Sequence, residues 1–369
     1  MRNSVVTQTQ NSSGLLGTVV AVQANFYRVR LERPEGENYP QYLLCTRRTR
    51  LKKIGQQVMV GDRVAIEEPD YADERGAIAE VFPRKTELNR PPVANADQIL
   101  LVFALEEPSL DAWQLSRFLV KAESTGLDLC LCLNKTDLVT KTQQQSWEER
   151  LGEWGYRPVF ISIAANRGLE QLLDRLKNKI TILAGPSGVG KSSLINKLIP
   201  AVEQRVSQVS GKLQKGRHTT RHVELFELPD GGLLADTPGF NQPDLDCDPA
   251  QLAQYFPEAR MRLAQGNCQF NDCLHRDEPN CAVRGDWERY EHYLRFLEEA
   301  IARQEAIQQT RDEESTVKLK IKALGQHQYE PKLETKRYRR RSRREKHQAL
   351  QDLYDSQSIE KLYEELEDY

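Results

Sequence analysis

The stretch Gly185-Pro186-Ser187-Gly188-Val189-Gly190-Lys191-Ser192-Ser193 constrains the fold most, because it matches the phosphate-binding loop G-x-x-x-x-G-K-[ST] at every fixed position. Its glycines let backbone N–H groups turn towards phosphate oxygens, and a helix expected at 193–198 directs its positive dipole end at them. An apolar run at 180–184 predicts the buried strand that must precede such a loop. The sequence therefore predicts an α/β domain that binds a nucleoside polyphosphate, with Lys191 on the β- and γ-phosphates and Ser192 on Mg²⁺. A glycine-rich turn without a ligand is the alternative.

A tetrad of polar residues follows another buried strand, expected at 127–133, and consists of Asn134, Lys135, Thr136 and Asp137. It resembles the N-K-x-D motif with which GTPases recognise guanine. The Asp137 carboxylate can accept hydrogen bonds from guanine N1–H and the 2-amino group, and adenine offers no matching pair of donors. We expect Asn134 to brace the loop and the base, and the Lys135 stem to lie along the purine. Alone, the tetrad could simply cap a helix; a phosphate loop in the same domain favours nucleotide binding.

Further candidate contacts lie in three short segments. Ser162-Ile163-Ala164 follows a strand expected at 159–161 and resembles the S-A-x loop that backs the base, with Ile163 where alanine is usual. Asp236-Thr237-Pro238-Gly239 resembles the second switch of GTPases, in which Asp236 would hold Mg²⁺ through water and the Gly239 amide would sense the γ-phosphate. The polar stretch around Thr219 and Thr220 is the candidate first switch.

The order of these motifs is unusual. In most GTPases the phosphate loop comes first, whereas here 134–137 and 162–164 precede Gly185, which indicates a circular permutation. Such a rearrangement is acceptable when the original termini lie close together at the surface. The second switch then leads almost directly into the C-terminal region, so we expect γ-phosphate contacts at Gly239 to be able to move that region.

The sequence pattern of the N-terminal region indicates a different fold. Short alternating segments at 17–22, 26–31, 41–45, 62–67 and 76–81 are separated by polar turns, which is typical of a small closed barrel of OB type. A basic run lies in its middle connection and comprises Arg47, Arg48, Arg50, Lys52 and Lys53. It could contact RNA, or it could be an ordinary solvated loop.

Beyond the second switch, three cysteines and a histidine, Cys268, Cys273, His275 and Cys281, supply the ligands of a closed structural Zn²⁺ site. A disulfide or free core thiols are the alternatives. Helical spacing at 287–307 predicts a mostly helical zinc domain. The charged region from Arg311 predicts a largely disordered tail in which a transient helix could form. Its arginine cluster at 332–346 could contact RNA phosphates or simply be solvated.

Length and composition place these parts in one chain of 369 residues with a net charge of −2 and 39% hydrophobic residues. Such a chain suggests two or three domains. We expect a disordered segment at 1–14, a barrel at 15–84, a permuted GTPase domain at 95–245, a zinc-binding domain at 246–310 and a tail at 311–369. Residues 1–14 lack the apolar stretch of a secretory signal, and no apolar run is long enough for a membrane span. Together with the odd number of cysteines, seven, these features favour a cytoplasmic protein with reduced thiols.

From about Leu15 to Ala300, the sequence of barrel, permuted GTPase and C-x4-C-x-H-x5-C segment resembles the RsgA (YjeQ) family of ribosome biogenesis GTPases. The resemblance implies GTP hydrolysis coupled to binding and release of the small ribosomal subunit, with rRNA contacts from the barrel and the zinc domain. Phe240 stands where many GTPases carry a water-orienting glutamine. The resemblance suggests His218 as the group that orients the water, assisted in catalysis by Lys191; a switch histidine that contacts RNA or solvent is the alternative.

Two other functions are compatible with the sequence. The protein could be an RNA-binding scaffold stabilised by nucleotide, although Lys191, Ser192 and Asp236 favour an enzyme. It could also be a permuted GTPase that acts on the large subunit or on another RNA. No heptad or other assembly signal is apparent, so we expect a monomer.

Overall fold

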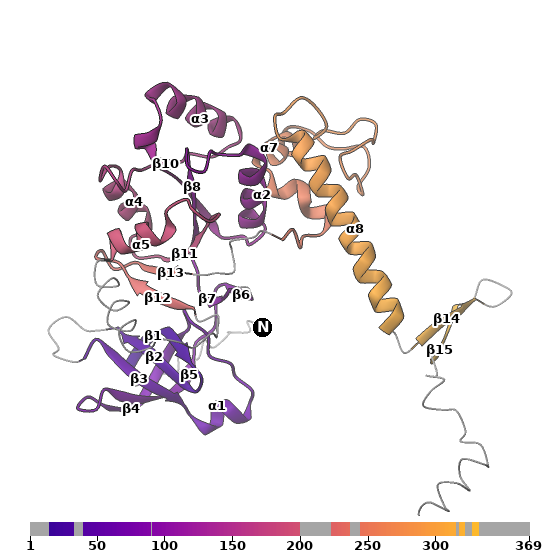
Figure 1. The fold of residues 1–369 in the computed structure, drawn as a ribbon. Coiled ribbons are helices and arrows are strands. Elements are labelled where there is room, and N and C mark those ends of the chain that lie inside the picture. Colours follow the sequence, from indigo (N-terminus) through magenta and orange to yellow (C-terminus); the bar gives the residue numbers. More distant parts are fainter. Residues whose placement is uncertain are drawn as a thin grey trace, which may run out of the picture. The chain divides into compact units, whose positions relative to one another are not determined.

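The computed structural model describes residues 15–32, 40–89, 91–199, 223–236, 244–314, 317–321 and 327–331. Two compact units divide the chain, residues 1–302 and residues 303–369. The first unit contains a barrel, a parallel sheet flanked by helices, and a C-terminal region built around one long helix (Figure 1).

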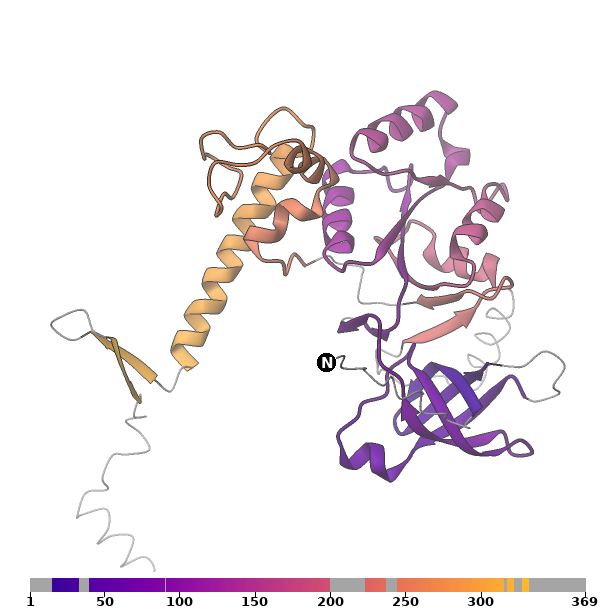
Figure 2. The ribbon, with the colours of Figure 1, turned by 180° about the vertical axis from the view of Figure 1, so that it is seen from behind.

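The barrel consists of β1 (Leu15–Gln23), β2 (Phe26–Leu31), β3 (Tyr42–Arg47), β4 (Arg63–Asp70) and β5 (Arg75–Val81). The strands pair in the order β1-β2-β3-β5-β4, and β4 pairs back onto β1, so the sheet closes on itself. Successive side chains of a strand point to opposite faces of the sheet. In β2, Tyr27, Val29 and Leu31 are buried in the barrel core, and the residues between them face outwards. The prediction of a closed OB-like barrel is confirmed, and Figure 2 shows the curled strands from behind.

The segment from Arg84 to Ala94, with Pro91 and Pro92, is expected from the sequence to link the barrel to the next domain. It contains a short antiparallel pair, β6 (Glu87–Asn89) and β7 (Pro92–Ala94). The Arg84 guanidinium donates from Nε to Oδ1 of the fully buried Asp62 at 2.8 Å, which ties the start of the linker to the barrel. Charge patterning alone could not show this tie, because the two residues meet only after the barrel has closed.

The second sheet contains β8 (Gln98–Ala104), β9 (Asp128–Asn134), β10 (Val159–Phe160), β11 (Ile180–Ala184), β12 (Glu224–Glu227) and β13 (Leu233–Asp236). Its order is β10-β9-β8-β11-β13-β12, and every pair is parallel except β12 with β13. Strand β8 is buried along its whole length. That pattern is expected for a parallel strand covered on both faces.

Helices cover both faces of this sheet. On one face, α2 (Ala112–Glu123) and the C-terminal end of α3 (Lys141–Glu153) pack against Ile99, Leu101 and Phe103. On the other face, α4 (Leu169–Leu176) and α5 (Lys191–Leu198) pack against the alternate residues of β8. Apolar spacing in the sequence predicts helices at 112–124, 169–176 and 193–198, which correspond to α2, α4 and α5. Helix α3 has one buried residue and therefore little apolar periodicity. Its visible sequence signal is the capping box formed by Thr140 and Gln143.

The C-terminal region begins with η3 (Pro249–Tyr255) and α7 (Pro257–Gln265) and ends with the long helix α8 (Tyr290–Glu314). Phe256, Tyr293 and Phe296 are central to its core. The residues between α7 and α8 lack regular helix, so this domain is helical around one irregular loop segment.

The second compact unit contains an antiparallel hairpin, β14 (Val317–Ile321) with β15 (His327–Pro331). The sequence predicts a largely disordered tail from Arg311 in which a transient helix could form. The end of α8 at Glu314 is compatible with that prediction, whereas the hairpin is an element that it did not include. The apolar residues of β14 alternate with lysines in the sequence, a period of two that is typical of a strand. The arginine cluster at 332–346 lies outside the described residues. In the described part of the chain, no helix has the length and apolar character to cross a membrane.

Candidate nucleotide site and metal centre

The candidate nucleotide motifs meet at one edge of the parallel sheet. The phosphate loop follows β11, the Asn134 tetrad begins at the end of β9, and Ser162 comes just after β10. Asp236 is the last residue of β13. Because parallel strands present their carboxyl ends on one side, segments far apart in the chain share a single ligand-binding edge.

The phosphate loop has the backbone shape that the motif predicts. Gly185 and Gly190 adopt φ values of 137° and 101°. A Cβ at Gly185 would lie 2.1 Å from the Val102 carbonyl oxygen, so a side chain has no space there. The Lys191 ammonium donates to the carbonyl oxygens of Gly185 at 2.8 Å and Pro186 at 2.6 Å, which holds it over the loop. Helix α5 begins at Lys191, so the free N–H groups of its first turn adjoin the loop.

Asn134 connects three of the motifs. Its side chain is buried, and its Nδ2 donates to the carbonyl oxygen of Val189 in the phosphate loop at 2.9 Å. Its Oδ1 accepts from the Ile163 amide at 3.4 Å. A Cβ at Gly190 would lie 2.5 Å from Nδ2, so glycine there leaves room for this bridge. The predicted bracing role of Asn134 therefore has a geometric basis that extends to the phosphate loop.

Asp137 is positioned by Ser162, whose hydroxyl donates to Oδ1 of the carboxylate through a very short hydrogen bond. The same hydroxyl accepts from the Ala165 amide at 2.9 Å, which fixes its direction. The bond from Ser162 is the main cause that lowers the pKa of Asp137 below its ordinary value. Asp137 is exposed and ionised at neutral pH, so it can accept hydrogen bonds from the edge of a base.

The structure also shows the contacts of Lys135 and Ile163, which the motifs alone do not predict. Lys135 adopts φ 61°, and its ammonium donates to the carbonyl oxygen of Glu107. The segment after β8 therefore adjoins the site, and Pro108 Cδ would lie 3.6 Å from a Cβ at Gly188. No sequence motif marks this segment, although its position after a buried parallel strand could have indicated it. Ile163, at the position where alanine is usual, packs with the core that contains Val189.

Several predicted site residues cannot be placed. His218, Thr219, Thr220 and Gly239 lie outside the described residues, and nothing of their geometry enters the site. Ser187, Ser192 and Ser193 lie exposed in the loop and the first turn of α5, where phosphate oxygens and a metal ion could reach them. Ala164 lies in the turn after Ser162, close to the segment that fixes Asp137.

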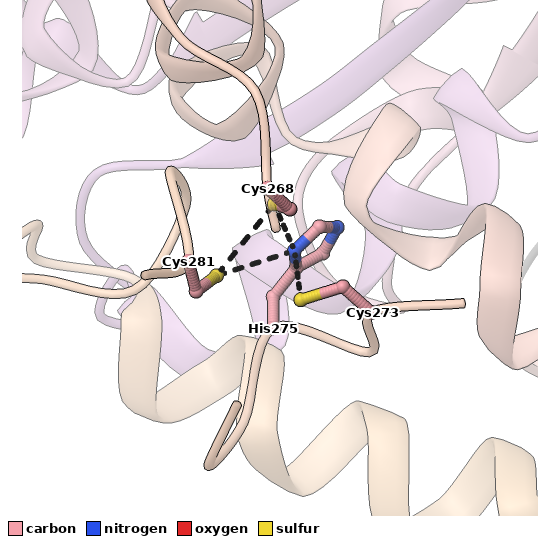
Figure 3. A group of neighbouring side chains, drawn as sticks. All are labelled: Cys268, Cys273, His275 and Cys281. Carbon is pink, nitrogen blue, oxygen red and sulfur yellow. Dashed lines mark hydrogen bonds between the residues drawn. The ribbon is translucent and has the colours of Figure 1, made fainter. Parts of the chain in front are cut away.

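The cysteines and the histidine of the C-terminal region converge as the sequence predicts. One ligand atom from each of Cys268, Cys273, His275 and Cys281 lies within 4.8 Å of the others. Figure 3 shows the three sulfurs around one ring nitrogen. The Sγ atoms of the three cysteines each lie 3.4 Å from His275 Nδ1. Bond lengths of about 2.3 Å to sulfur and 2.0 Å to nitrogen give tetrahedral edges of ~3.5 Å from S to N and ~3.8 Å from S to S. The 3.9 Å between the sulfurs of Cys268 and Cys281 agrees with such an edge.

The surrounding residues hold this cluster in place. The hydroxyls of Tyr290 and Tyr293 on α8 donate to the carbonyl oxygens of His275 at 2.9 Å and Leu274 at 2.7 Å. Glu278 accepts from the Leu274 and Arg276 amides, both at 2.8 Å. Burial raises the pKa of the Cys273 thiol to about 12 and lowers the pKa of His275. A bound cation would compensate the cost of a thiolate here, so the donor set fits a metal ion.

Comparison with known proteins agrees with this geometry. Residues 81–246 match the family model described as RsgA GTPase. The small ribosomal subunit biogenesis GTPase RsgA of Trichormus variabilis is 66% identical over 361 residues, which cover 93% of this chain and 98% of the relative. The chain belongs to the RsgA GTPase family. A relative with the same description from Synechocystis is 57% identical and covers 95% of this chain and 98% of its own length.

Two solved structures share the fold of this chain. YloQ, described as a circularly permuted GTPase, has a TM-score of 0.65 at 31% identity, with 82% of this chain and 99% of YloQ covered. YjeQ from Thermotoga maritima has a TM-score of 0.64 at 33% identity, with 78% and 98% covered. Both solved structures are covered almost completely, so the fold that they share with this chain extends over most of it.

Proposed function

We propose that this protein hydrolyses GTP to GDP and phosphate and assists late maturation of the small ribosomal subunit, to which it binds in its GTP state. The observation that carries the nucleotide part is the link between Asn134 and Val189, because it joins the base-recognition segment to the phosphate loop. The subunit is proposed from the names of the relatives, each a small ribosomal subunit biogenesis GTPase.

We assign a group of residues to bind each part of the nucleotide: the base, the phosphates and the accompanying Mg²⁺. Asp137 accepts from the guanine edge, with Asn134, Lys135, Thr136, Ser162 and Ala164 around the base. The loop from Gly185 to Ser193 surrounds the phosphates, and Lys191 stabilises negative charge on the transferred phosphoryl group. Ser192 and Asp236 would hold Mg²⁺, which when bound neutralises charge on the phosphate oxygens. Thr219, Thr220 and Gly239 complete the γ-phosphate contacts.

His218 is the proposed group that orients the attacking water. A neutral imidazole can accept a proton or orient water near neutral pH, and Phe240 at the usual glutamine position cannot. We expect His218→Ala to lower subunit-stimulated turnover about 10²- to 10⁴-fold with little change in GDP affinity. Full stimulated turnover in this variant would remove His218 from the mechanism.

Zinc is the metal proposed for Cys268, Cys273, His275 and Cys281. Three sulfur ligands and one nitrogen ligand suit a closed tetrahedral site, and such sites stabilise folding rather than perform chemistry. Because the tyrosines of α8 bond to the same loop, the metal would hold that loop against the long helix.

The barrel is proposed to contact rRNA through part of its basic run. Arg47 donates to the Gln56 carbonyl oxygen at 2.6 Å, and Arg48 pairs with Glu68 at 2.7 Å, so both serve the barrel itself. Arg50, Lys52 and Lys53 are exposed on α1 (Thr49–Lys53) and can reach phosphate groups. We propose a monomer located in the cytoplasm, where ribosomal subunits mature.

Phosphate release from GTP and ATP, with and without purified small or large subunits at fixed salt, tests this function. Slow GTP-selective turnover that rises strongly with small subunits supports it. Turnover that responds to large subunits or to another RNA instead assigns the enzyme a different partner. Turnover that no partner stimulates would favour a nucleotide-stabilised scaffold, and equal use of ATP would contradict the role of Asp137. Lys191→Ala serves as the inactive control.

A further inference from the structure

The barrel and the nucleotide domain share a strand contact. Strand β1 pairs with β12 through Ala21 and Glu224, so the two sheets form one continuous sheet. This pairing involves one residue from each strand, which makes it a narrow backbone connection. Side chains must therefore provide much of what holds β12 against the barrel.

Glu227 at the end of β12 supplies most of these side-chain contacts. Its carboxylate accepts from Arg30 at 3.0 Å, Gln41 at 2.6 Å and Tyr42 at 2.9 Å, all of them barrel residues. Arg28 lies 3.7 Å from Glu224 and stacks over the Tyr42 ring at 4.3 Å. We call the contacts of Glu224 and Glu227 with these barrel residues the β12 latch.

The position of the β12 latch relates it to the nucleotide. In the β12–β13 pair, Glu224 lies opposite Asp236, which is the residue proposed to hold Mg²⁺. Glu224 also lies opposite Ala21 of the barrel. A backbone displacement at Asp236 therefore reaches the barrel across one strand.

The C-terminal region is attached quite differently. Arg289 is fully buried and donates to Glu258 at 2.7 Å, and its guanidinium lies 4.8 Å from the Trp154 ring centroid. Trp154 Nε1 donates to Glu288 at 2.6 Å, and Val120 of α2 belongs to the C-terminal core. A shared apolar core and a buried guanidinium against Trp154 resist displacement more than partly exposed charges do.

From this contrast we infer that β12 transmits the nucleotide state to the barrel, while the C-terminal region stays fixed on α2 and α3. The sequence alone pointed to the C-terminal region, which follows the second switch in the chain. The inference rests on the proposed nucleotide site at Asp236. It assigns Glu227 a regulatory role in which the carboxylate holds the barrel in one nucleotide state and releases it in the other.

Hydrogen–deuterium exchange of the full chain, loaded with GDP or with a non-hydrolysable GTP analogue, tests the inference. We expect the rates of amide exchange at 26–31 and 42–47 to differ between the two states by about 5-fold or more. A factor of about 5 is the weak end of the usual range of coupling between two sites. Glu227→Gln removes the Glu227 charge from the β12 latch and should reduce this difference to less than about 2-fold. Glu299→Gln is the matched control, because Glu299 forms a two-bond ion pair with Arg117 at the other interface.

Nucleotide titration comes first, because it tests the proposed nucleotide site separately from the role inferred for β12. If GDP and the analogue fail to bind, the proposed function fails and the exchange comparison is not interpreted. With binding intact in all variants, three results would overturn the inference: equal barrel exchange in both states, a response at 112–123 and 290–300 instead, or an undiminished difference in Glu227→Gln. A response in the barrel that Glu299→Gln keeps and Glu227→Gln loses supports it.

Discussion

Asn134 donates a hydrogen bond to the Val189 carbonyl oxygen at 2.9 Å, and this bond joins two residues 55 positions apart in the chain. The tetrad proposed to recognise the base and the phosphate loop are thereby held at a fixed spacing by the protein itself. A site arranged in advance loses less entropy on binding, so the bond should contribute to affinity without touching the phosphates.

Removal of this bridge should weaken nucleotide binding. In Asn134→Ala the buried Val189 carbonyl loses its partner, which costs about 1–3 kcal/mol. We expect the affinities for GDP and GTP to fall together by about 10- to 100-fold, as titration of a fluorescent nucleotide would measure. Asn95→Ala is the control, because Asn95 donates a similar bond to the Gly61 carbonyl oxygen at 3.0 Å beside the barrel. Unchanged affinity in Asn134→Ala would show that the bridge has no part in binding.

The base preference should change with Asp137. A carboxylate accepts from both guanine donors, whereas the amide of Asp137→Asn presents one acceptor and one donor, which matches xanthine with its carbonyl at C2. Loss of a hydrogen bond to a charged group costs about 1.5–3 kcal/mol, so GTP affinity should fall about 10- to 100-fold while XTP affinity rises. Competition between GTP, XTP and ATP measures this. A variant with the original order of affinities would place base recognition elsewhere.

The pH dependence of binding should report the bond from Ser162 to Asp137. Because this bond lowers the pKa of Asp137, its contribution is present above the unfolded pKa of about 3.9 and is lost as pH falls through the folded value. The native protein should therefore keep its affinity for GDP to a lower pH than Ser162→Ala. Titrations between about pH 3.5 and 7 compare the two midpoints.

A matched control for that comparison exists in the segment after β8. Ser109 donates to Glu106 Oε1 at 2.5 Å, which is the same kind of bond to a different carboxylate. Ser109→Ala should leave the midpoint of the native protein unchanged. Coincident midpoints for the native protein and Ser162→Ala would contradict the assigned cause.

Loss of one metal ligand should empty the cysteine and histidine cluster. Structural zinc contributes about 10–16 kcal/mol in small zinc peptides, so Cys281→Ser should lose its metal and unfold at lower temperature. Metal analysis after dialysis, together with thermal denaturation, measures both effects. Cys247→Ser changes a cysteine outside the cluster and should keep about one equivalent of zinc. Retention of stoichiometric zinc by Cys281→Ser would contradict the ligand assignment.

The buried pair of Arg289 and Glu258 should be important for stability. Arg289→Met leaves the Glu258 carboxylate buried without its partner, which costs about 3–5 kcal/mol in free energy of unfolding. The double variant Glu258→Leu with Arg289→Met removes both charges and should recover much of that loss. Denaturation followed by tryptophan fluorescence is suitable, because Trp154 adjoins Arg289. A loss below about 1 kcal/mol in Arg289→Met would mean that packing alone stabilises this part of the C-terminal region.

Sequence patterns determined the local elements and the chemistry of individual motifs. The strand at 180–184 and the helix at 169–176 have the predicted bounds, because burial on both faces and apolar spacing leave clear periodicity. The phosphate loop was recognisable because its backbone path requires glycine at particular positions. Helix α3 lacked such a signal, since its one buried residue leaves the rest of it facing solvent.

Tertiary structure decided which of these elements touch. Ser162 and Asp137 meet because parallel strands place their carboxyl ends together, and Glu227 meets Arg30, 197 positions away, because β12 lies beside the barrel. The same holds for the attachment of the C-terminal region, where Arg289 is buried against residues from two other segments. A sequence pattern records the periodicity of one element, but contacts between distant elements depend on how the sheets and helices pack, and that is a property of the folded chain.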